Sequence, residues 1–349
     1  MRRRPSPRRV FRAPAAVALL MPVLLTATGC VTVHGEREII PSVDKAEAPR
    51  VLKRFTDGYT AAYRKLDPAL VDRVEGGALA EIGRADVTAQ RAATPQGNPG
   101  YPALVLDDAR FTIPKMAGWP KFFVADTRSN RDKNRWLVVF TREGAQAPWK
   151  ASYLSLMAED KVPRFALDKD GYAQVPGAAR KSGGDAAEPA GPAVAPEAVS
   201  GAYTDYLRTG QGSAFAPGAP SLIRDERAKL VRTPTFWTEY IDTPEKAPSF
   251  PAPALSTPDG GALVFFTAHH REKRTMAKGL RPSVSDPRTK ALLSGDLQHA
   301  VTFTRVSESA VLVPPKKSGP EKSGSGKGAS DSGIVFLNRI ESLTAAKGE

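Results

Sequence analysis

The chain has four histidines, and two of them, His269 and His270, are adjacent in a segment typical of a β-strand. Imidazole side chains bind metal ions and exchange protons near neutral pH. Neighbouring residues of a strand point to opposite faces, so this pair cannot hold one metal ion together. His299 could meet one of them across a sheet, but no third ligand is visible, and His34 lies near the N-terminus. We therefore predict no metal site.

Two acids, Asp57 and Asp205, occupy similar positions in two segments with helical periodicity. An aspartate beside a histidine inside a cavity could act as a general base. The first half of the chain has no histidine beyond His34, so we expect both acids to lie on exposed helix faces. No catalytic residue is predicted from them.

Other motifs with chemical meaning are incomplete. The run from Asp168 to Gly171 (DKDG) is similar to part of a calcium loop but lacks the remaining ligand positions, so it predicts a turn. The chain has no nucleophile elbow, no phosphate-binding glycine loop and no paired-histidine zinc motif. We expect no cofactor, and we leave open whether the protein is an enzyme, with a non-enzymatic role favoured.

Basic residues gather in two segments that we expect to be equivalent hairpins. They are Arg128, Arg131, Lys133 and Arg135 in the first half, and Arg271, Lys273 and Arg274 in the second. Such hairpins could bind an envelope protein, an anionic cell-wall polymer or lipid headgroups. The alternative is that both are ordinary solvated loops.

The N-terminal 29 residues are typical of an export signal. Six arginines and no acidic residue precede an apolar run from Ala13 to Leu25. Small residues then lead to Cys30, the only cysteine in the sequence. The apolar run is too short to favour a membrane-spanning helix. We predict a signal peptide over residues 1–29.

The segment from Thr26 to Cys30 (TATGC) resembles the lipobox of bacterial lipoproteins. This resemblance implies cleavage between Gly29 and Cys30, and a lipid on the Cys30 thiol that attaches the protein to the membrane. Two acyl chains suffice for stable anchoring. The run with Arg8, Arg9 and Phe11 is also similar to a twin-arginine export signal, although the general secretory route remains an equal alternative.

Composition limits the remaining classes of function. The 349 residues carry a formal charge of +13, and removal of the six leader arginines lowers it to +7. We therefore expect no nucleic-acid partner. With Cys30 lipidated, the mature chain has no thiol for a disulfide or a metal site. We expect an extracytoplasmic location on the outer face of the cytoplasmic membrane.

The elements expected in the first half are helices followed by strands. Apolar residues recur at helical spacing over Glu47–Leu70, and a second helix is predicted from Ala69 to Ala89, weakened by a glycine pair. Strands are predicted over 103–113, 121–127, 135–142 and 149–157. After a tether over 30–46, these elements form a predicted domain over 47–176.

A linker over 177–196 lacks aromatic residues and separates the predicted second domain, 197–345. This domain starts with helices over 195–207 and 222–230. A short strand or the end of a helix is expected over 235–240, and further strands over 261–270, 298–307, 310–313 and 333–340. The low-complexity run 318–332 predicts a disordered loop.

The halves also share short sequence matches in the same order. Leu137–Thr141 (LVVFT) matches Leu263–Thr267 (LVFFT), and Phe55–Asp57 (FTD) matches Tyr203–Asp205 (YTD). We expect an α+β fold of two tandem repeats, each with its helices packed on a curved antiparallel sheet. The alternative is two unrelated α+β domains.

This element order resembles NTF2-like and cystatin-like cone folds, and the chain resembles uncharacterised actinobacterial (Streptomyces-like) lipoproteins with duplicated domains. The function favoured is a membrane-anchored, non-enzymatic binding or interaction module of the cell envelope. The alternatives are a ligand-binding lipoprotein associated with transport and a cone-fold hydrolase or isomerase.

Overall fold

The computed structural model describes residues 38–177, 191–212, 214–316 and 333–349, and the chain from Arg37 to Glu349 forms one compact unit. The predicted signal peptide, Cys30, most of the tether, the centre of the linker and the low-complexity loop lie outside the described residues. We call residues 38–177 the N-terminal half and residues 191–349 the C-terminal half. Helices and mainly antiparallel sheets give an α+β fold, as predicted.

Three helices begin the N-terminal half: α1 (Glu47–Lys65), α2 (Pro68–Val74) and α3 (Gly77–Ala93). Helix α1 ends at Leu66, which adopts a left-handed conformation, and Asp67 caps α2 by accepting a hydrogen bond from the Ala69 amide. The predicted second helix is therefore two helices. Glu75 and Gly76 are extended and interrupt the helical conformation, and Gly77 then adopts a positive φ.

The N-terminal sheet has the strand order β2-β4-β5-β6, formed by β2 (Leu106–Thr112), β4 (Lys121–Ser129), β5 (Arg135–Arg142) and β6 (Lys150–Met157). The four predicted strands are confirmed, and a polar loop over residues 130–134 joins β4 to β5. Strands β1 (Ile40–Pro41) and β3 (Lys115–Met116), of two residues each, pair with each other in a separate small sheet. One face of the sheet packs on α1, where Phe55 contacts Phe140 edge to face.

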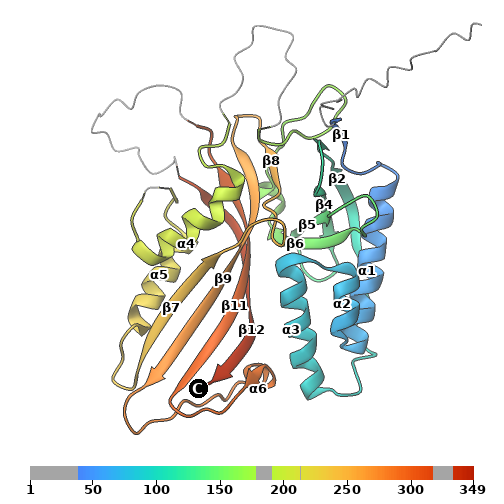
Figure 1. The fold of residues 1–349 in the computed structure, drawn as a ribbon. Coiled ribbons are helices and arrows are strands. Elements are labelled where there is room, and N and C mark those ends of the chain that lie inside the picture. Colours follow the sequence, from blue (N-terminus) through green and yellow to red (C-terminus); the bar gives the residue numbers. More distant parts are fainter. Residues whose placement is uncertain (1–37, 178–190, 213, 317–332) are drawn as a thin grey trace, which may run out of the picture. The chain divides into compact units, whose positions relative to one another are not determined.

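The C-terminal half places α4 (Val199–Thr209) and α5 (Ala219–Leu230) before a second sheet (Figure 1). Its order is β10-β12-β11-β9-β7, and the four long strands are antiparallel to one another: β7 (Phe236–Pro244), β9 (Ala262–Met276), β11 (Ala300–Val313) and β12 (Val335–Gly348). Short β8 (Ala254–Ser256) pairs with β9, while β10 (Leu293–Ser294), which follows α6 (Pro287–Ala291), is parallel to β12.

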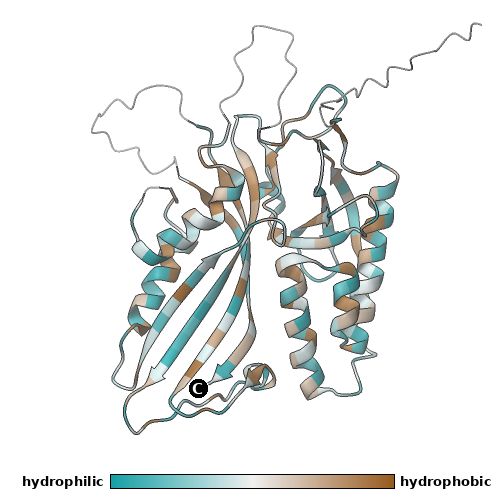
Figure 2. Cartoon of the chain, in the orientation of Figure 1, coloured by the Kyte–Doolittle hydropathy of each residue, from teal (hydrophilic) through white to brown (hydrophobic). Residues whose placement is uncertain are grey.

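The strands of the second sheet are longer than their sequences suggested. Strand β9 runs eight residues beyond its apolar part, from His269 to Met276, and the segments predicted as separate strands over 298–307 and 310–313 are one strand, β11. Figure 2 shows the change along β9 from hydrophobic to hydrophilic. The polar part pairs with β7 and β11 through the backbone, which apolar alternation does not report.

The two sheets pack against each other through the faces that their helices leave free. Leu137 and Val139 of β5 lie in one buried cluster with Leu263 and Phe265 of β9. The Tyr153 hydroxyl of β6 donates a 2.6 Å hydrogen bond to the Pro251 carbonyl. These faces of the two sheets are therefore buried against each other.

Charged contacts continue this packing where α3 reaches the second sheet. His269 is bound on both ring nitrogens, with Nε2 2.8 Å from Glu81 of α3 and Nδ1 2.9 Å from Glu245. The hydrogen bond to Glu81 is the largest contribution that raises the pKa of His269, and Glu245 adds to it. Arg288 of α6 forms a further ion pair with Asp86 of α3.

Candidate functional site

A pocket of about 390 Å³ lies between α5 and the sheet of the C-terminal half. Leu222, Ile223 and Leu230 of α5 form its apolar wall. Side chains of all four long strands form the remainder: Tyr240, His270, Arg271, Glu272, Arg305, Arg339 and Glu341, with Glu226 and Arg227 contributed by α5. The pocket thus combines an apolar wall with a charged floor.

Strand register explains why these polar residues share one face. Asp242 of β7 lies opposite His270 of β9, and His270 lies opposite Arg305 of β11. Two positions along β11, Ser307 lies opposite Glu341 of β12. Because side chains alternate with a period of two, these residues point toward α4 and α5, whereas His269 points toward α3. The sequence prediction that His269 and His270 face opposite sides is confirmed.

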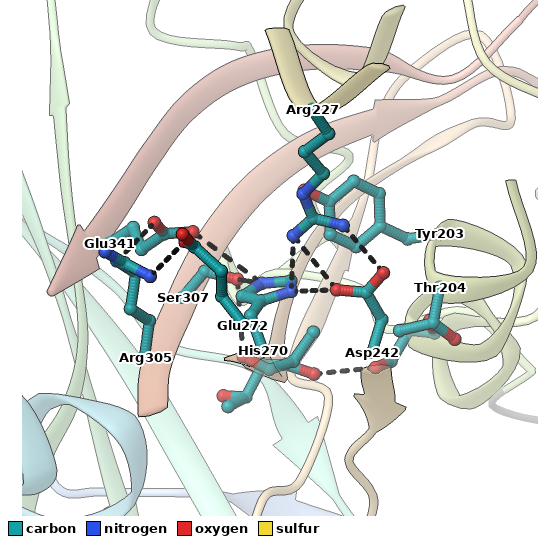
Figure 3. Close-up of polar contacts among 12 residues, drawn as sticks. Tyr203, Thr204, Arg227, Asp242, His270, Glu272, Arg305, Ser307 and Glu341 are labelled. Carbon is teal, nitrogen blue, oxygen red and sulfur yellow. Dashed lines mark hydrogen bonds and ion pairs between the residues drawn. The ribbon is translucent and has the colours of Figure 1, made fainter. Parts of the chain in front are cut away.

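His270 is the centre of the polar network in Figure 3. Its Nδ1 lies 2.6 Å from Asp242 Oδ1, and its Nε2 lies 2.8 Å from Ser307 Oγ. Burial lowers the pKa of His270, and the positive charge of Arg339 lowers it further, although Asp242 opposes both. We assign a neutral ring in which Nδ1–H donates to Asp242 and Nε2 accepts from the Ser307 hydroxyl.

Arg227 attaches α5 to the sheet through Asp242. Its two terminal nitrogens donate hydrogen bonds of 2.7 and 3.0 Å to the two Asp242 oxygens, a bidentate pair. The Arg227 guanidinium also lies 4.8 Å from the ring centre of Tyr240. Burial alone would raise the pKa of Asp242, but hydrogen bonds from His270 and Arg227 outweigh it and lower that pKa, so the carboxylate stays ionised.

The opposite side of the pocket contains a second set of ion pairs. Arg305 donates a 2.8 Å hydrogen bond to Glu272, and Arg339 donates to Glu341 and to the Tyr203 hydroxyl. Burial acts to raise the pKa of Glu341, but Arg339 and the other nearby positive groups outweigh it, so the pKa is lowered. The floor therefore presents acidic side chains beside guanidinium groups.

Asp242, His270 and Ser307 form the same chain of hydrogen bonds as a serine hydrolase triad. Ser307 is fully buried, however, and it does not line the pocket. A nucleophilic hydroxyl must come within contact distance of a substrate carbonyl, and this structure gives Ser307 no such approach. What the three residues do here is fix the tautomer and position of His270.

The first basic segment does not present all of its residues on the surface. Arg135 is 1% exposed and binds Asp126 and Asp108, so it holds the β4–β5 pair together. Arg128 pairs with Asp108 and Glu159, and Arg131 stacks on a tyrosine ring. Lys133 is exposed in the loop.

The second basic segment lies along β9, not in a hairpin loop. Lys273 pairs with Glu349 and Arg274 pairs with Glu272, while Arg271 is exposed at the pocket. The structure therefore does not bring the two basic segments into equivalent positions. Binding of a partner by either segment stays a prediction.

The acids predicted to have no catalytic role lie on helix faces or in a turn, as expected, whereas His299 does not meet another histidine. Asp57 and Asp205 are exposed and pair with Lys53 and Arg208 on their own helices. Asp168 and Asp170 belong to a turn whose carboxylates bind Lys115. His299 precedes β11 and does not meet the other histidines, because Val306 and Arg305 occupy those register positions. Arg8, Arg9, Phe11, Gly29 and Cys30 lie outside the described residues.

Sequence reasoning missed the residues that complete the site. Asp242 and Ser307 lie 28 and 37 residues from His270 along the chain, and Arg227 lies 15 residues from Asp242. No local motif joins positions so far apart. The one available signal was a histidine in the polar extension of a strongly apolar strand.

Comparison with known proteins places the chain in a family. A family model described as a domain of unknown function, DUF8094, matches residues 40–333. The chain belongs to this family. No solved structure matches the chain.

Three relatives carry the name uncharacterized lipoprotein. The chain is 43% identical to one from Streptomyces avermitilis and 41% identical to one from Streptomyces coelicolor, each over 98% of this chain and 97% of the relative. A second Streptomyces coelicolor protein is 26% identical over 79% of this chain and 78% of its own length. These matches bear out the resemblance to Streptomyces lipoproteins.

Two features are absent from the described part of the chain. No helix there is both long enough and apolar enough to cross a bilayer. Within the same residues, no three or more His, Cys, Asp or Glu side chains are grouped so that they could hold a metal ion.

Replacing Asp242 by Asn tests the network. The change leaves the Arg227 charge without its buried partner, so we expect Asp242→Asn to lower the free energy of unfolding by about 3 kcal/mol. Denaturant unfolding would measure this, with Glu226→Gln as the control. Glu226 is a solvent-exposed acid of α5, next to Arg227, and it forms an ion pair with Lys229. Loss of its charge should therefore change the free energy of unfolding little. Equal effects of the two variants would contradict the account.

Proposed function

We propose that the protein is a lipid-anchored, extracytoplasmic binding protein without enzymatic activity. Its pocket beneath α5 would hold a short peptide terminus with an apolar side chain. The observation that carries this proposal is the pocket itself, which places an apolar wall opposite a floor of arginines and glutamates. Pockets of this kind orient ligands through a few polar groups while apolar surface supplies affinity.

The chemistry of the floor favours a ligand with both hydrogen-bond donors and acceptors. Arg305 has five N–H donors but donates only one hydrogen bond to the described residues, and Arg271 donates none to them. A carboxylate could accept from these guanidinium groups. Glu272 and Glu341 could accept from the amide or amine of the same ligand, because the carboxyl groups of both residues line the pocket.

The wall of the pocket accounts for the apolar side chain. Leu222 is 65% exposed, and α5 has Pro220 as its only buried residue in the described structure. A ligand side chain that covers Leu222, Ile223 and Leu230 would remove this apolar surface from water. Few buried contacts also allow α5 to adjust to a ligand.

The anchored location is supported by the export signal, the lipobox resemblance at Cys30 and the printed names of the relatives. Membrane attachment would place the pocket among envelope peptides. Exposed basic residues such as Lys133 and Arg271 would assist contact with an envelope protein or an anionic cell-wall polymer. No nucleic acid and no cofactor are part of this proposal.

We infer further that the halves are NTF2-like or cystatin-like repeats. In support, each half has helices followed by a four-stranded antiparallel meander, β2-β4-β5-β6 and β7-β9-β11-β12. The sequence match between Leu137–Thr141 and Leu263–Thr267 aligns β5, the third strand of the first meander, with β9, the second strand of the other. The match is therefore offset from the strand order by one strand. An ancestral unit smaller than either present sheet would account for the offset.

Anchoring is tested by fatty-acid labelling in the native host. We expect radiolabelled palmitate to enter the wild-type protein and the label to be lost in Cys30→Ala, because only the thiol accepts the lipid. A Met21→Ala variant, changed within the same predicted signal, is the matched control and should keep the label. Labelling of Cys30→Ala at the wild-type level would contradict the anchor.

Ligand binding is tested by calorimetry on the full chain carrying Cys30→Ser. We expect alanyl-leucine to bind, and alanyl-leucinamide, which lacks the carboxylate, to bind at least about tenfold more weakly. Arg305→Met should weaken alanyl-leucine binding by a similar factor, whereas Arg281→Met, at an exposed arginine outside the pocket, should not. Equal binding of the dipeptide and its amide, or no effect of Arg305→Met, would contradict the peptide-terminus assignment.

A further inference from the structure

A second cleft, of about 320 Å³, has a lining that shares no residue with the pocket beneath α5. Its walls come from the start of β4, from Val175 and Pro176, from η2 (Pro196–Ala198), and from the proline-rich segment that joins β7 to β8. Pro120, Pro251 and Pro253 line it together with Met116, Phe122 and Val175. Proline rings have little freedom to move, so the cleft is largely preformed.

Lys121 is the one cation that lines this cleft. The residue is only 5% exposed, and its Nζ forms no hydrogen bond or ion pair with the residues that the structure describes. Its single recorded partner is the Trp119 ring, 5.4 Å from Nζ to the ring centre. Lysines are almost never buried unless they are paired.

Burial has a measurable effect on this lysine. Loss of solvent lowers the pKa of Lys121, and only the charge of Glu38 acts in the opposite direction, from beyond ion-pair distance. Lys121 Nζ has no counter-ion within ion-pair distance among the described residues, and an anion entering the cleft would supply one. The cleft therefore favours a ligand with a negative charge.

We propose that this cleft is a second ligand site, which binds a small monocarboxylate with a hydrocarbon body. Its carboxylate would pair with Lys121 Nζ, and its body would lie against Phe122, Val175 and Pro251. The volume falls within the range of about 300–1,000 Å³ typical of small-molecule sites. This site is independent of the proposed peptide pocket, since the two share no lining residue.

The charges of the cleft favour a single negative charge on the ligand. A phosphate is usually bound by several cations or by a guanidinium, and here one ammonium stands alone. Glu197, which is exposed and also lines the cleft, would repel a dianion more than a monoanion. A carboxylate therefore matches the site better than a phosphate group does.

Octanoate is a suitable probe, with octylamine and octyl phosphate as probes of altered charge. On the full chain carrying Cys30→Ser, we expect calorimetry to detect octanoate binding, with octylamine and octyl phosphate at least about tenfold weaker. Lys121→Met should weaken octanoate binding by a similar factor, whereas Lys121→Arg should largely retain it. Lys133→Met, at an exposed lysine in the β4–β5 loop, should have no effect.

A chemical measurement avoids dependence on a folded Lys121→Met variant. In the Cys30→Ser chain, octanoate should slow acetylation of Lys121 by an activated ester without slowing that of Lys133, as read by peptide mass spectrometry. Equal modification rates with and without octanoate would overturn the proposal. Unchanged octanoate affinity in Lys121→Met would also overturn it, as would tighter binding of octylamine than of octanoate. Loss of octanoate binding in Arg305→Met but not in Lys121→Met would place octanoate beneath α5 and so overturn it too.

Discussion

The alternation of side chains along β9 is the constraint on which both halves of the molecule depend. This strand is covered on two sides, so each of its residues must suit one of two different environments. Phe265 faces the N-terminal sheet, and Phe266 faces α4, where it contacts Tyr203 edge to face. A shift of register by one residue would exchange these environments for the whole strand.

The adjacent histidines show what this constraint does to charge. His270 lies in a buried network that satisfies both ring nitrogens, and burial lowers its pKa. His269, one residue earlier, lies between two carboxylates from different segments, and its pKa is raised. The pKa values of these identical side chains therefore shift in opposite directions, because hydrogen bonds to two acids dominate at His269 and burial dominates at His270.

Much of the fold could be predicted from the sequence, because its helices and central strands have clear apolar periods. Helix α1 and strands β4 and β5 follow their patterns closely. The polar ends of β9, β11 and β12 could not be predicted in this way, since backbone pairing and ion pairs hold them. The packing of one sheet on the other was also hidden, because an apolar face does not identify its partner.

The candidate site was less accessible to sequence reasoning than the fold. His270 was recognised as a residue of interest, but Asp242, Ser307 and Arg227 reach it only through register and through the position of α5. Lys121 gave no signal either, because its burial depends on a proline-rich segment from the other half of the chain. Long-range contacts of this kind require the three-dimensional structure.

The most direct test of the two-faced strand is to follow the imidazole nitrogens of His269 and His270 by NMR from pH 5 to pH 9. The account predicts that His270 stays neutral with its proton on Nδ1 until the pH falls below the usual histidine range of about 6.5. His269 should remain charged to a pH above that range. Titration of both rings together, or protonation of His270 at a higher pH than His269, would contradict the account.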